Sequence, residues 1–433
     1  MSLAWSVPIL QSHREVKPLT AFRITRSHRK ARLVASVSLA SVVVLLAGCS
    51  GQGGETPSEG GAEAFELVVV NSQSGPLAAA GGIPQSNGLR TLVDLINEDG
   101  GIDGREVNLT FVDSAGDAAQ AVNNLQTYLA DNEAPDAIMA GQYSFEALAL
   151  APITTQAKIF ATSTSVSPAV TNVEEFPYTF QTAIPNPVIV KAMAEKLAEE
   201  GYTTVGYIAA DDESGRSAVE GFKAIAAEHD LEVVSGFVPT TSVDATPALE
   251  ALRAEDPDAL VINGTGAVAT AILSARTKIG WDVISYGEGG GFASQDLGVI
   301  SKPEDWKNLL VQQGNYGVYP SPMTDGEAFE TFHSRYLEDY GPIENGFTSQ
   351  ISGAEAILAI KAAYEASDGD EVEELVAALE SLNGKPIPDS ISKWWVGPSE
   401  FAYTSDVHAN YAWSSSDFSY TPAGPLKDGM ITP

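Results

Sequence analysis

Short runs rich in Val and Ile alternate with longer amphipathic segments from Phe65 to about Leu309. Strands separated by helices of about 10–15 residues are typical of repeated βαβ units, whose right-handed crossovers place helices on both faces of a parallel sheet. The runs predict strands at Glu66–Asn71, Val107–Asp113, Ala137–Ala140, Ile159–Thr162, Thr204–Ala209, Glu232–Phe237, Ala259–Asn263 and Val283–Tyr286. The amphipathic segments predict helices at Leu89–Asn97, Ala118–Asp131, Val188–Glu200, Ser217–Glu228 and Val268–Ile279.

One parallel sheet over this length would exceed the usual size of a domain, so we expect two Rossmann-like α/β lobes joined by a hinge. Two prolines in Thr-Ala-Ile-Pro-Asn-Pro, 182–187, interrupt the periodicity and predict the boundary there. After Leu309 the patterns are mainly helical, at Asp325–Asp339, Gln350–Ala366 and Glu371–Leu382. We expect one lobe from 65–183 and 313–392, and a second from 184–312, with closing strands and a tail over 393–433.

Such a fold predicts where a ligand binds. In open α/β sheets the ligand site lies beyond the carboxyl ends of the strands. Two lobes that face each other across a hinge form a cleft that closes on its ligand. The fold class therefore predicts a ligand site in the cleft between the two lobes.

The first 64 residues follow another pattern. A basic run, 23–32, precedes an uncharged apolar stretch of 16 residues, 33–48, and then comes Cys49, the only cysteine. The stretch is short for a membrane span, which takes about 20 residues, and this order is typical of a secretory signal. Leu-Ala-Gly-Cys resembles a bacterial lipobox. We expect a lipoprotein signal peptide over 1–48, palmitate or a similar lipid on Cys49 and a Gly- and Ser-rich flexible tether over 49–64. A membrane anchor helix with an incidental cysteine is the alternative.

The expected mature chain is strongly acidic. The first 48 residues hold seven of the 24 Lys and Arg and one of the 57 acids, so residues 49–433 carry 17 basic and 56 acidic residues, a formal charge of −39. Nucleic acid phosphates and anionic lipids would repel such a surface, so neither is an expected partner. With its one cysteine in the anchor, the exported chain has no disulfide and depends on its apolar core for stability.

Three motifs in the first third of the chain carry a resemblance. They are Ser74-Gly75-Pro76-Leu77-Ala78, then Asn97-Glu-Asp-Gly-Gly-Ile-Asp-Gly104, then Asp113-Ser-Ala-Gly-Asp117 with Gln120-Ala121. The glycines of the second motif permit positive φ at a helix end, and the last aspartate of the third can cap a helix. In this order the motifs resemble those of the substrate-binding lipoproteins of ABC importers of the leucine/isoleucine/valine-binding type.

The resemblance covers most of residues 65–300. It implies the type I periplasmic binding fold, a small-molecule ligand, an ABC permease in the membrane as partner, no cofactor and no catalysis. We expect a monomer, tethered through Cys49 on the extracytoplasmic face of the cell membrane. The same fold in a tethered receptor that reports its ligand to a sensor protein remains an open alternative.

A loop after the third expected strand carries the first candidate contacts. Gly141-Gln142-Tyr143 leads into a helix that we expect to begin near Phe145, and N–H groups at a helix start form a natural carboxylate site. Matched to the family, Ser144 falls on the serine that holds the ligand's carboxylate, with Tyr143 beside it. A plain helix N-cap is the alternative role of Ser144.

A second loop follows the fourth expected strand, and its family counterpart contacts the same amino-acid head. Val166 stands where the family has a threonine, so Thr164 and Ser165 would supply the hydroxyls. A serine-rich loop without a ligand role is the alternative. The resemblance thus implies two adjacent polar loops on the first lobe.

In the second lobe the family pairs an acid with the ligand's ammonium, and Glu288 takes this position here. The alternative is a solvated loop acid. The branched-chain binders place tyrosines around the ligand where this chain has Ala80, Ser214 and Thr265. Unless Tyr143 or Gln142 fills the space, the pocket is wider or more polar, and leucine-like ligands are held poorly. We expect a small polar organic ligand, foremost an amino acid or an amide or acid relative.

Enzymatic alternatives have weaker support. Asn263-Gly-Thr-Gly-Ala-Val-Ala269 reads G-x-G-x-x-A, with Glu288 24 residues beyond Gly264, which resembles a dinucleotide fingerprint. It lies deep in the chain, however, and an exported protein has no obvious NAD supply, so a tight strand-to-helix turn is the favoured reading. No G-x-S-x-G occurs, and His229, His333 and His408 have no sequence neighbours that indicate a triad or a metal pair.

Overall fold

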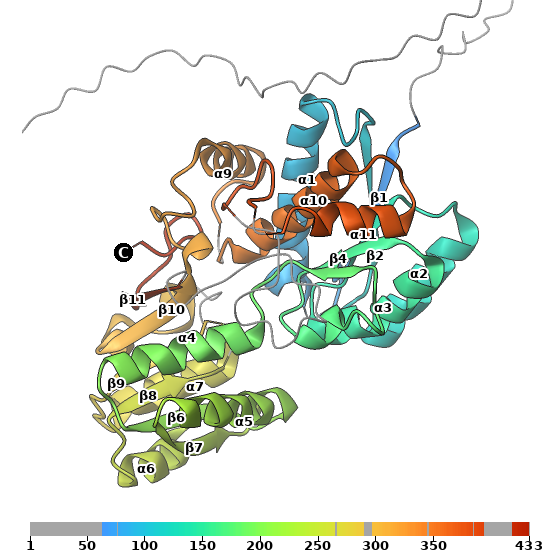
Figure 1. The fold of residues 1–433 in the computed structure, drawn as a ribbon. Helices are drawn as coiled ribbons and strands as arrows, with labels where there is room; N and C mark the ends of the chain where they lie inside the picture. The colour runs from blue at the N-terminus through green and yellow to red at the C-terminus, as the bar shows by residue number, and fades with distance from the viewer. Residues whose placement is uncertain are drawn as a thin grey trace, which may run out of the picture. The chain divides into compact units, whose positions relative to one another are not determined.

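The computed structural model describes residues 63–75, 77–264, 266–289, 297–343, 346–383, 385–393 and 418–432. The expected signal peptide, Cys49 and most of the expected tether lie outside these residues, as does Thr265. The described elements belong to one compact unit, Gly60–Pro433, which contains two sheets and the helices that cover them (Figure 1).

The first sheet has five parallel strands in the order β2-β1-β3-β4-β5. Val and Ile side chains alternate between its two faces, as the pleat of a strand requires. Leu67 and Val69 pack toward helices α1, α10 and α11, whereas Val68 and Val70 pack toward α2 and α3 (Figure 1). The elements are β1 (Phe65–Asn71), α1 (Ile83–Glu98), β2 (Val107–Asp113), α2 (Ala118–Asp131), β3 (Ala137–Ala140), α3 (Ser144–Ala157), β4 (Phe160–Ser163), β5 (Thr179–Gln181), α10 (Thr348–Ala366) and α11 (Val372–Glu380).

The second sheet has six strands in the order β11-β10-β9-β8-β6-β7, and only β11 runs antiparallel to its neighbour. Val205 and Tyr207 pack toward α4 and α5, and Ile208 packs toward α6 and α7. The elements are α4 (Asn186–Glu199), β6 (Thr204–Ala210), α5 (Glu213–Glu228), β7 (Glu232–Val238), α6 (Thr246–Ala254), β8 (Ala259–Ile262), α7 (Gly266–Lys278), β9 (Ile284–Gly287), α8 (Leu297–Ile300), β10 (Leu309–Gly314) and β11 (Phe418–Pro422).

The expected α/β class with two parallel sheets is confirmed. Each of the eight expected strands is present, with ends within one residue of the prediction. The expected helices are also present, although α1 begins six residues before the predicted start at Leu89. Strands β5 and β10 were not predicted, because β5 has only three residues and β10 ends in Gln-Gln-Gly.

The chain passes between the two sheets three times. It leaves the first sheet after β5 and enters the second through α4, then returns after β10 through the short helix η4 (Asn315–Gly317). Helices α9 (Glu327–Tyr340) and α10 then pack on α1, and β11 lies again in the second sheet. The connections 182–185 and 315–317 therefore lie where the two lobes meet.

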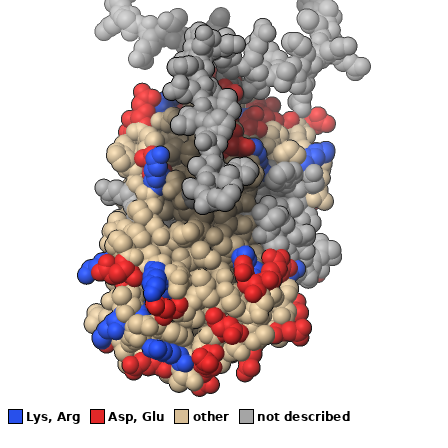
Figure 2. Space-filling view, turned by 90° about the vertical axis from the view of Figure 1, so that its left-hand side faces the viewer, with Lys and Arg blue, Asp and Glu red and all other residues tan. Residues whose placement is uncertain are grey.

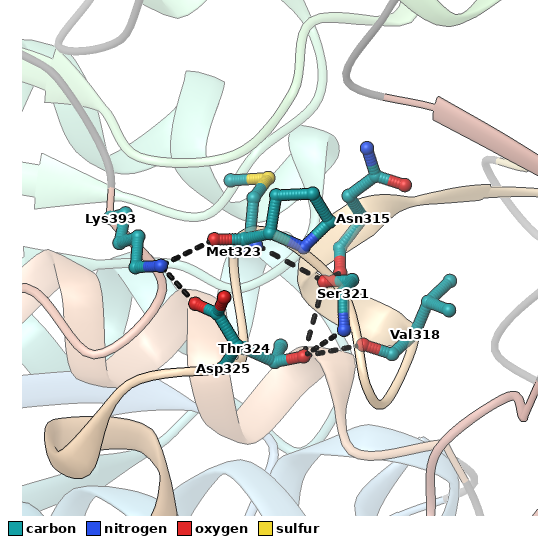
Figure 3. A network of polar contacts seen from close by, with 8 residues as sticks. Asn315, Val318, Ser321, Met323, Thr324, Asp325 and Lys393 are labelled. Carbon is teal, nitrogen blue, oxygen red and sulfur yellow. Dashed lines mark hydrogen bonds and ion pairs between the residues drawn. The ribbon is translucent and has the colours of Figure 1, made fainter.

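Hydroxyl groups hold the turn that follows η4 (Figure 3). Ser321 Oγ donates a hydrogen bond of 2.6 Å to the carbonyl oxygen of Asn315. Thr324 Oγ1 donates one of 2.7 Å to the carbonyl oxygen of Val318. The carbonyl oxygen of Asn315 also accepts the N–H of Val318 at 3.3 Å, so the hydroxyls add side-chain hydrogen bonds to a turn of the backbone. The return connection is therefore an ordered turn.

Lys393 joins this turn to a more distant part of the chain. Its Nζ donates a hydrogen bond of 2.6 Å to the carbonyl oxygen of Pro322 and forms an ion pair with Asp325 (Figure 3). Both charged side chains are partly exposed, so the ion pair contributes little stability on its own, about 1 kcal/mol or less. Its effect is to fix the end of the segment 385–393 beside the turn.

The surface reflects the acidic composition, a formal charge of −33 for the whole chain. On the face drawn in Figure 2, acidic side chains gather toward the lower end with basic ones among them, and a broad band above them has few charges. Some opposite charges on the surface form exposed ion pairs, such as Lys278–Asp244 at 3.3 Å. Charged side chains are thus unevenly distributed over this face, and the net charge of the chain is negative.

Candidate functional site

A cavity of about 230 Å³ lies where the two lobes meet. Its volume is near the lower end for ligand sites, which are roughly 300–1,000 Å³, so it suits a small molecule. Side chains from the first lobe, the connections and the second lobe line it. They are Gln85, Gln142, Tyr143, Ser144, Thr164, Val166, Ala183, Ile184, Ile189, Gly289, Gln313, Tyr316, Thr348, Ser349 and Ser352.

The topology of the first sheet explains this location. Strand β1 pairs with β2 on one side and with β3 on the other. Successive strands are therefore added to the sheet first in one direction and then in the opposite direction. Ligand sites of doubly wound sheets lie beyond the carboxyl ends of the strands at such a switch point. Gln142 and Tyr143 follow β3 directly, and both line the cavity.

Three helices begin at the cavity. The first residues of α3 and α10, Ser144 and Thr348, line it, as does the fourth residue of α4, Ile189. Gln85 of α1 also lines it, but α1 continues directly from a π-helix over Ala78–Gly82 and has no free start there. The N-terminus of a helix carries a partial charge of about +0.5 and N–H groups without intrahelical partners. These helix starts thus contribute partial positive charge at the cavity wall, and the acid Glu146 lies in the first turn of α3.

Hydrogen bonds tie the cavity's polar side chains to the sheet. Asn71, at the end of β1, donates a bond of 3.2 Å to Gln85 Oε1. Gln85 Nε2 in turn donates one of 3.2 Å to Thr164 Oγ1, which donates one of 3.4 Å to the carbonyl oxygen of Gln142. All four residues are buried, so these bonds hold the lining side chains in one arrangement.

Ser144 and Ser165 lie together. Ser165 Oγ donates a hydrogen bond of 3.0 Å to Ser144 Oγ, and Ser165 itself is buried and does not line the cavity. Helix α3 begins at Ser144, and its N-cap residue is Tyr143, one position before the N-cap that the sequence indicated. The serine therefore lies inside the first turn, with its hydroxyl oriented by a buried neighbour.

A buried acid holds the loop before α3. Glu146 Oε2 accepts hydrogen bonds from the backbone N–H groups of Gln142 and Tyr143, at 3.2 and 3.3 Å. Its other oxygen, Oε1, accepts from Ser72 Oγ at 3.1 Å and from Ser114 Oγ at 2.5 Å. The carboxylate is fully buried and joins the ends of β1 and β2 to the cavity loop. Sequence reasoning did not single it out.

The ring of Tyr143 lies against the short π-helix η1 (Ala78–Gly82). A Cβ atom on Gly81 would lie 2.7 Å from Tyr143 Oη and from Gln142 Nε2, so the absence of a side chain there makes room for both. The ring also stacks on Phe145, with centroids 5.8 Å apart. Burial and then the charge of Glu146 raise the pKa of Tyr143. Ala80, where the resemblance places a tyrosine, belongs to η1. Tyr143, from a different element, approaches η1 at the next residue, Gly81.

Glu288 follows β9 but does not line the cavity, whereas its neighbour Gly289 does. The carboxylate accepts hydrogen bonds from the hydroxyl of Tyr207 and, at 2.7 Å, from Asn263 Nδ2. Glu288 is only 3% exposed, so the alternative role, a solvated loop acid, is wrong, and the expected contact with a ligand ammonium stays a prediction. The reason is that β9, β8 and β6 are neighbours, which brings their three carboxyl ends together.

Burial governs the titration of this cluster. It raises the pKa of Glu288, against the opposing effect of the two hydrogen bonds, and raises that of Tyr207 well above its usual range. The acid that a dinucleotide site would direct toward a ribose is therefore occupied within the second lobe. Asn263, the residue before the G-x-G-x-x-A segment, is one of its partners. The segment makes the strand-to-helix turn from β8 into α7.

Of the remaining residues predicted from the sequence, two line the cavity and two do not belong to its described lining. Thr164 and Val166 line the cavity with Tyr143 and Ser144. Ser214 lies in the first turn of α5, and Thr265 is outside the part of the chain that the structure describes.

Several lining residues were not predicted. Ala183 and Ile184 belong to the connection 182–185, and Ile189 belongs to α4. Gln313 belongs to β10, and Tyr316 belongs to the second connection, 315–317. Burial raises the pKa of Tyr316 to about 12. The proline-rich boundary was the available signal, because residues at a hinge between lobes necessarily border the cleft. Thr348, Ser349 and Ser352 reach the cavity only through the packing of α10 on α1.

Two further observations concern the described residues. Within them, no cluster of three or more His, Cys, Asp or Glu side chains is arranged to hold a metal ion. Nor do these ranges contain a helix with the length and apolar composition that crossing a membrane requires.

Comparisons with known proteins agree with this architecture. The chain is similar to a type 1 periplasmic binding protein from Bordetella pertussis Tohama I, with 18% identity, 83% of this chain and 96% of that chain covered, and a TM-score of 0.66. It is similar to an ABC transporter substrate-binding protein from Desulfitobacterium hafniense in complex with Leu, with 20% identity, 85% and 99% covered, and a TM-score of 0.65. A solute binding protein of an R. palustris ABC transporter, in complex with benzoate, shows 19% identity, 77% and 91% covered, and a TM-score of 0.61. No curated protein sequence matches the chain.

At these identities the solved structures show the fold alone. A family model described as periplasmic binding protein matches residues 66–396, which include both sheets except β11. The match spans well over half of the 433 residues and most of the cavity-lining elements. This chain belongs to the periplasmic binding protein family.

Proposed function

We propose that this protein is the extracytoplasmic solute-binding lipoprotein of an ABC importer, anchored through Cys49. It captures a small polar organic solute between its lobes and delivers it to a membrane permease. The observation that carries this proposal is the cavity itself, which lies beyond the carboxyl ends of the strands and is lined by both lobes and both connections. The similar structures bind Leu and benzoate, which are solutes of comparable size.

The proposed ligand contacts follow the geometry. Ser144 and the N–H groups at the start of α3 bind a polar group of the solute. Thr164 and Tyr143 line the same wall, and Val166 provides apolar contact. Ser165 acts through Ser144 by its hydrogen bond of 3.0 Å. Ala80, Ser214 and Thr265 remain candidates by resemblance alone.

A thermal-shift screen of small metabolites, followed by isothermal titration calorimetry, tests the proposal. A ligand selective for the folded state raises the melting temperature in proportion to the logarithm of its concentration above Kd. We expect Ser144→Ala to weaken a confirmed ligand at least about tenfold, since a hydrogen bond to a charged group contributes about 1.5–3 kcal/mol. Ser217→Ala, at an exposed position of α5, is the matched control. An unchanged affinity in Ser144→Ala would remove Ser144 from the site.

Transport and anchoring need separate tests. Deletion of the gene should abolish uptake of the confirmed solute, whereas a sensor receptor would leave uptake intact and change a transcriptional or motility response. Replacement of Cys49 by Ser should release the mature chain from the membrane fraction, because a thioether-linked lipid cannot form on a hydroxyl. A membrane-bound Cys49→Ser variant would contradict lipid anchoring at this residue.

A further inference from the structure

Gln312 is a fully buried residue of the second lobe, outside the described lining of the cavity. It belongs to β10, and its directly opposite partner in the antiparallel strand β11 is Tyr420. Directly opposite residues of paired strands project from the same face of a sheet, so the two side chains can meet. A buried glutamine is stable only where its polar atoms have partners, and the partners of this amide come from three separate elements.

Both ends of the amide are engaged. Its Nε2 donates a hydrogen bond of 2.9 Å to the carbonyl oxygen of Ile189 and one of 3.2 Å to the hydroxyl of Tyr420. Its Oε1 accepts the backbone N–H of Gly289 at 3.1 Å. The hydroxyl of Tyr420 in turn donates a bond of 2.8 Å to the carbonyl oxygen of Ala192. Because Gly289 and Ile189 line the cavity, one side chain joins two parts of its second-lobe wall.

The elements joined in this way are the second-lobe ends of the three passages of the chain between the sheets. Helix α4, which carries Ile189, begins directly after the connection 182–185, and β10 ends directly before the connection 315–317. Strand β11 is where the chain enters the second sheet again. Gln312 on β10 is bonded to both α4 and β11, so all three passages are fixed to one side chain.

Two further contacts support the same grouping. Ser419 Oγ donates a hydrogen bond of 2.5 Å to Asn315 Oδ1, which bonds β11 to the connection 315–317 itself. A Cβ atom on Gly289 would lie 3.1 Å from the carbonyl oxygen of Gln312, so the cavity loop lies closely against β10. Hydrogen bonds that share atoms in a buried network strengthen one another, and such a group opens as a cooperative unit.

We infer that Gln312 is a positioning residue of the cleft. Together with Tyr420 it binds the three passages and the second-lobe wall of the cavity into one unit, which turns as a whole when the lobes open and close. Bending is then confined to the residues of the connections, as in hinged domains. This inference concerns the hinge, and it holds whichever solute the cleft takes and whether or not the protein serves a permease.

Hydrogen exchange followed by mass spectrometry tests the shared unit on the purified mature protein without ligand. Tyr420→Phe keeps the ring and removes the bonds to Ala192 and Gln312. Gly289 is bonded to the other end of the Gln312 amide. If the unit opens as one, the variant should nevertheless speed exchange of the Gly289 N–H about tenfold, the factor that one net hydrogen bond contributes.

Tyr364→Phe is the matched control. The hydroxyl of Tyr364 likewise donates to a backbone carbonyl, that of Asp136, at 2.6 Å. Asp136 directly precedes β3, whereas the cavity lies beyond the other end of that strand. Loss of this hydroxyl should leave exchange at Gly289 and in α4 unchanged.

Distances between the lobes test the positioning role. Spin labels on Gln126→Cys of α2 and Ala224→Cys of α5, two exposed positions in different lobes, report these distances by double electron–electron resonance in a Cys49→Ser background without ligand. Gln312→Met keeps the length of the side chain and removes all three bonds of the amide. The distribution of interlobe distances should be broader in this variant than in the wild type, because the passages then bend separately.

The outcomes are distinct. If Tyr420→Phe speeds exchange only in α4, the passages open separately and the inference is wrong. An unchanged distance distribution in folded Gln312→Met removes the positioning role, and an equal broadening in Tyr364→Phe reduces it to a general loss of stability. If Gln312→Met does not fold, the distance distribution of Tyr420→Phe decides in its place. A failed uptake or ligand test would leave these results unchanged, so the proposed function and this inference can fail independently.

Discussion

The hydroxyl of Ser114 donates a hydrogen bond of 2.5 Å to the carboxylate of Glu146, which joins the end of β2 to the first turn of α3. The same carboxylate binds Ser72 and the backbone N–H groups of Gln142 and Tyr143. A fully buried acid with four neutral donors is thus the structural support of the loop that lines the cavity. Its contribution to binding acts through that loop.

Glu146→Gln tests this support. An amide has only one acceptor oxygen, so its NH₂ group would face two donors that the carboxylate now accepts. We expect a loss of about 2 kcal/mol of unfolding free energy, measured by urea denaturation, and at least a tenfold loss of ligand affinity. Glu228→Gln, at an exposed position of α5, is the matched control. If stability falls but the affinity of the folded variant is unchanged, Glu146 has no positioning role.

Gly81→Ala tests the close approach of η1 to the cavity loop. The added Cβ would come within 2.7 Å of Tyr143 Oη and Gln142 Nε2, so one or both side chains must move. We expect at least a tenfold loss of ligand affinity with a loss of about 1 kcal/mol or less in stability, since ends of side chains move more easily than backbone. Gly221→Ala is the control. Its Cβ meets open space within α5, and it should add up to about 1 kcal/mol of stability. Unchanged affinity in Gly81→Ala would show that Tyr143 and Gln142 do not need their observed positions.

Glu355, on α10, predicts a pH dependence of stability. It is fully buried and accepts hydrogen bonds from the backbone N–H and hydroxyl of Ser392 and from the hydroxyl of Ser390, at 2.8, 2.9 and 3.0 Å. Burial outweighs these bonds and raises the pKa of Glu355 to about 7. The folded state therefore favours the protonated acid. This contribution to stability is complete below the ordinary pKa of 4.5 and is lost as the pH rises through about 7.

Glu355→Gln removes this titration and retains an acceptor oxygen. Compared with the wild type, the variant should be more stable at pH 8, by at most about 3 kcal/mol, and about equally stable at pH 5. Urea denaturation at the two pH values measures the difference between the two proteins, which cancels the titration of other groups. If the difference in unfolding free energy between the two proteins is the same at pH 5 and pH 8, the raised pKa of Glu355 is contradicted.

Tyr207→Phe tests whether the Glu288 cluster belongs to the ligand site. The variant loses the hydroxyl that donates to Glu288, and we expect a loss of about 2 kcal/mol of unfolding free energy, since a buried acid loses one of its donors. Because the cluster does not line the cavity, ligand affinity should change less than threefold. A tenfold or larger loss of affinity in the folded variant would connect Glu288 to the ligand.

The local sequence was sufficient to predict most secondary structure. Runs such as Val107–Asp113 and Ala137–Ala140 match their strands residue for residue, because short apolar runs between helical patterns are a local property of the sequence. The loop after β3 was likewise recognisable as a candidate site, and Tyr143 and Ser144 line the cavity. Strand β5 escaped prediction because three residues are too few to establish a period.

The sequence by itself determined the alternation of strands and helices and the small polar residues that follow the strands. Only the tertiary structure decided which of these residues meet. The order β9-β8-β6 buries Glu288 with Tyr207 and Asn263, and the packing of α10 on α1 brings Thr348 to the cavity. The physical reason is that hydrophobic periodicity is a property of neighbouring residues. Pairing of strands and packing of helices instead depend on residues that are distant in the chain.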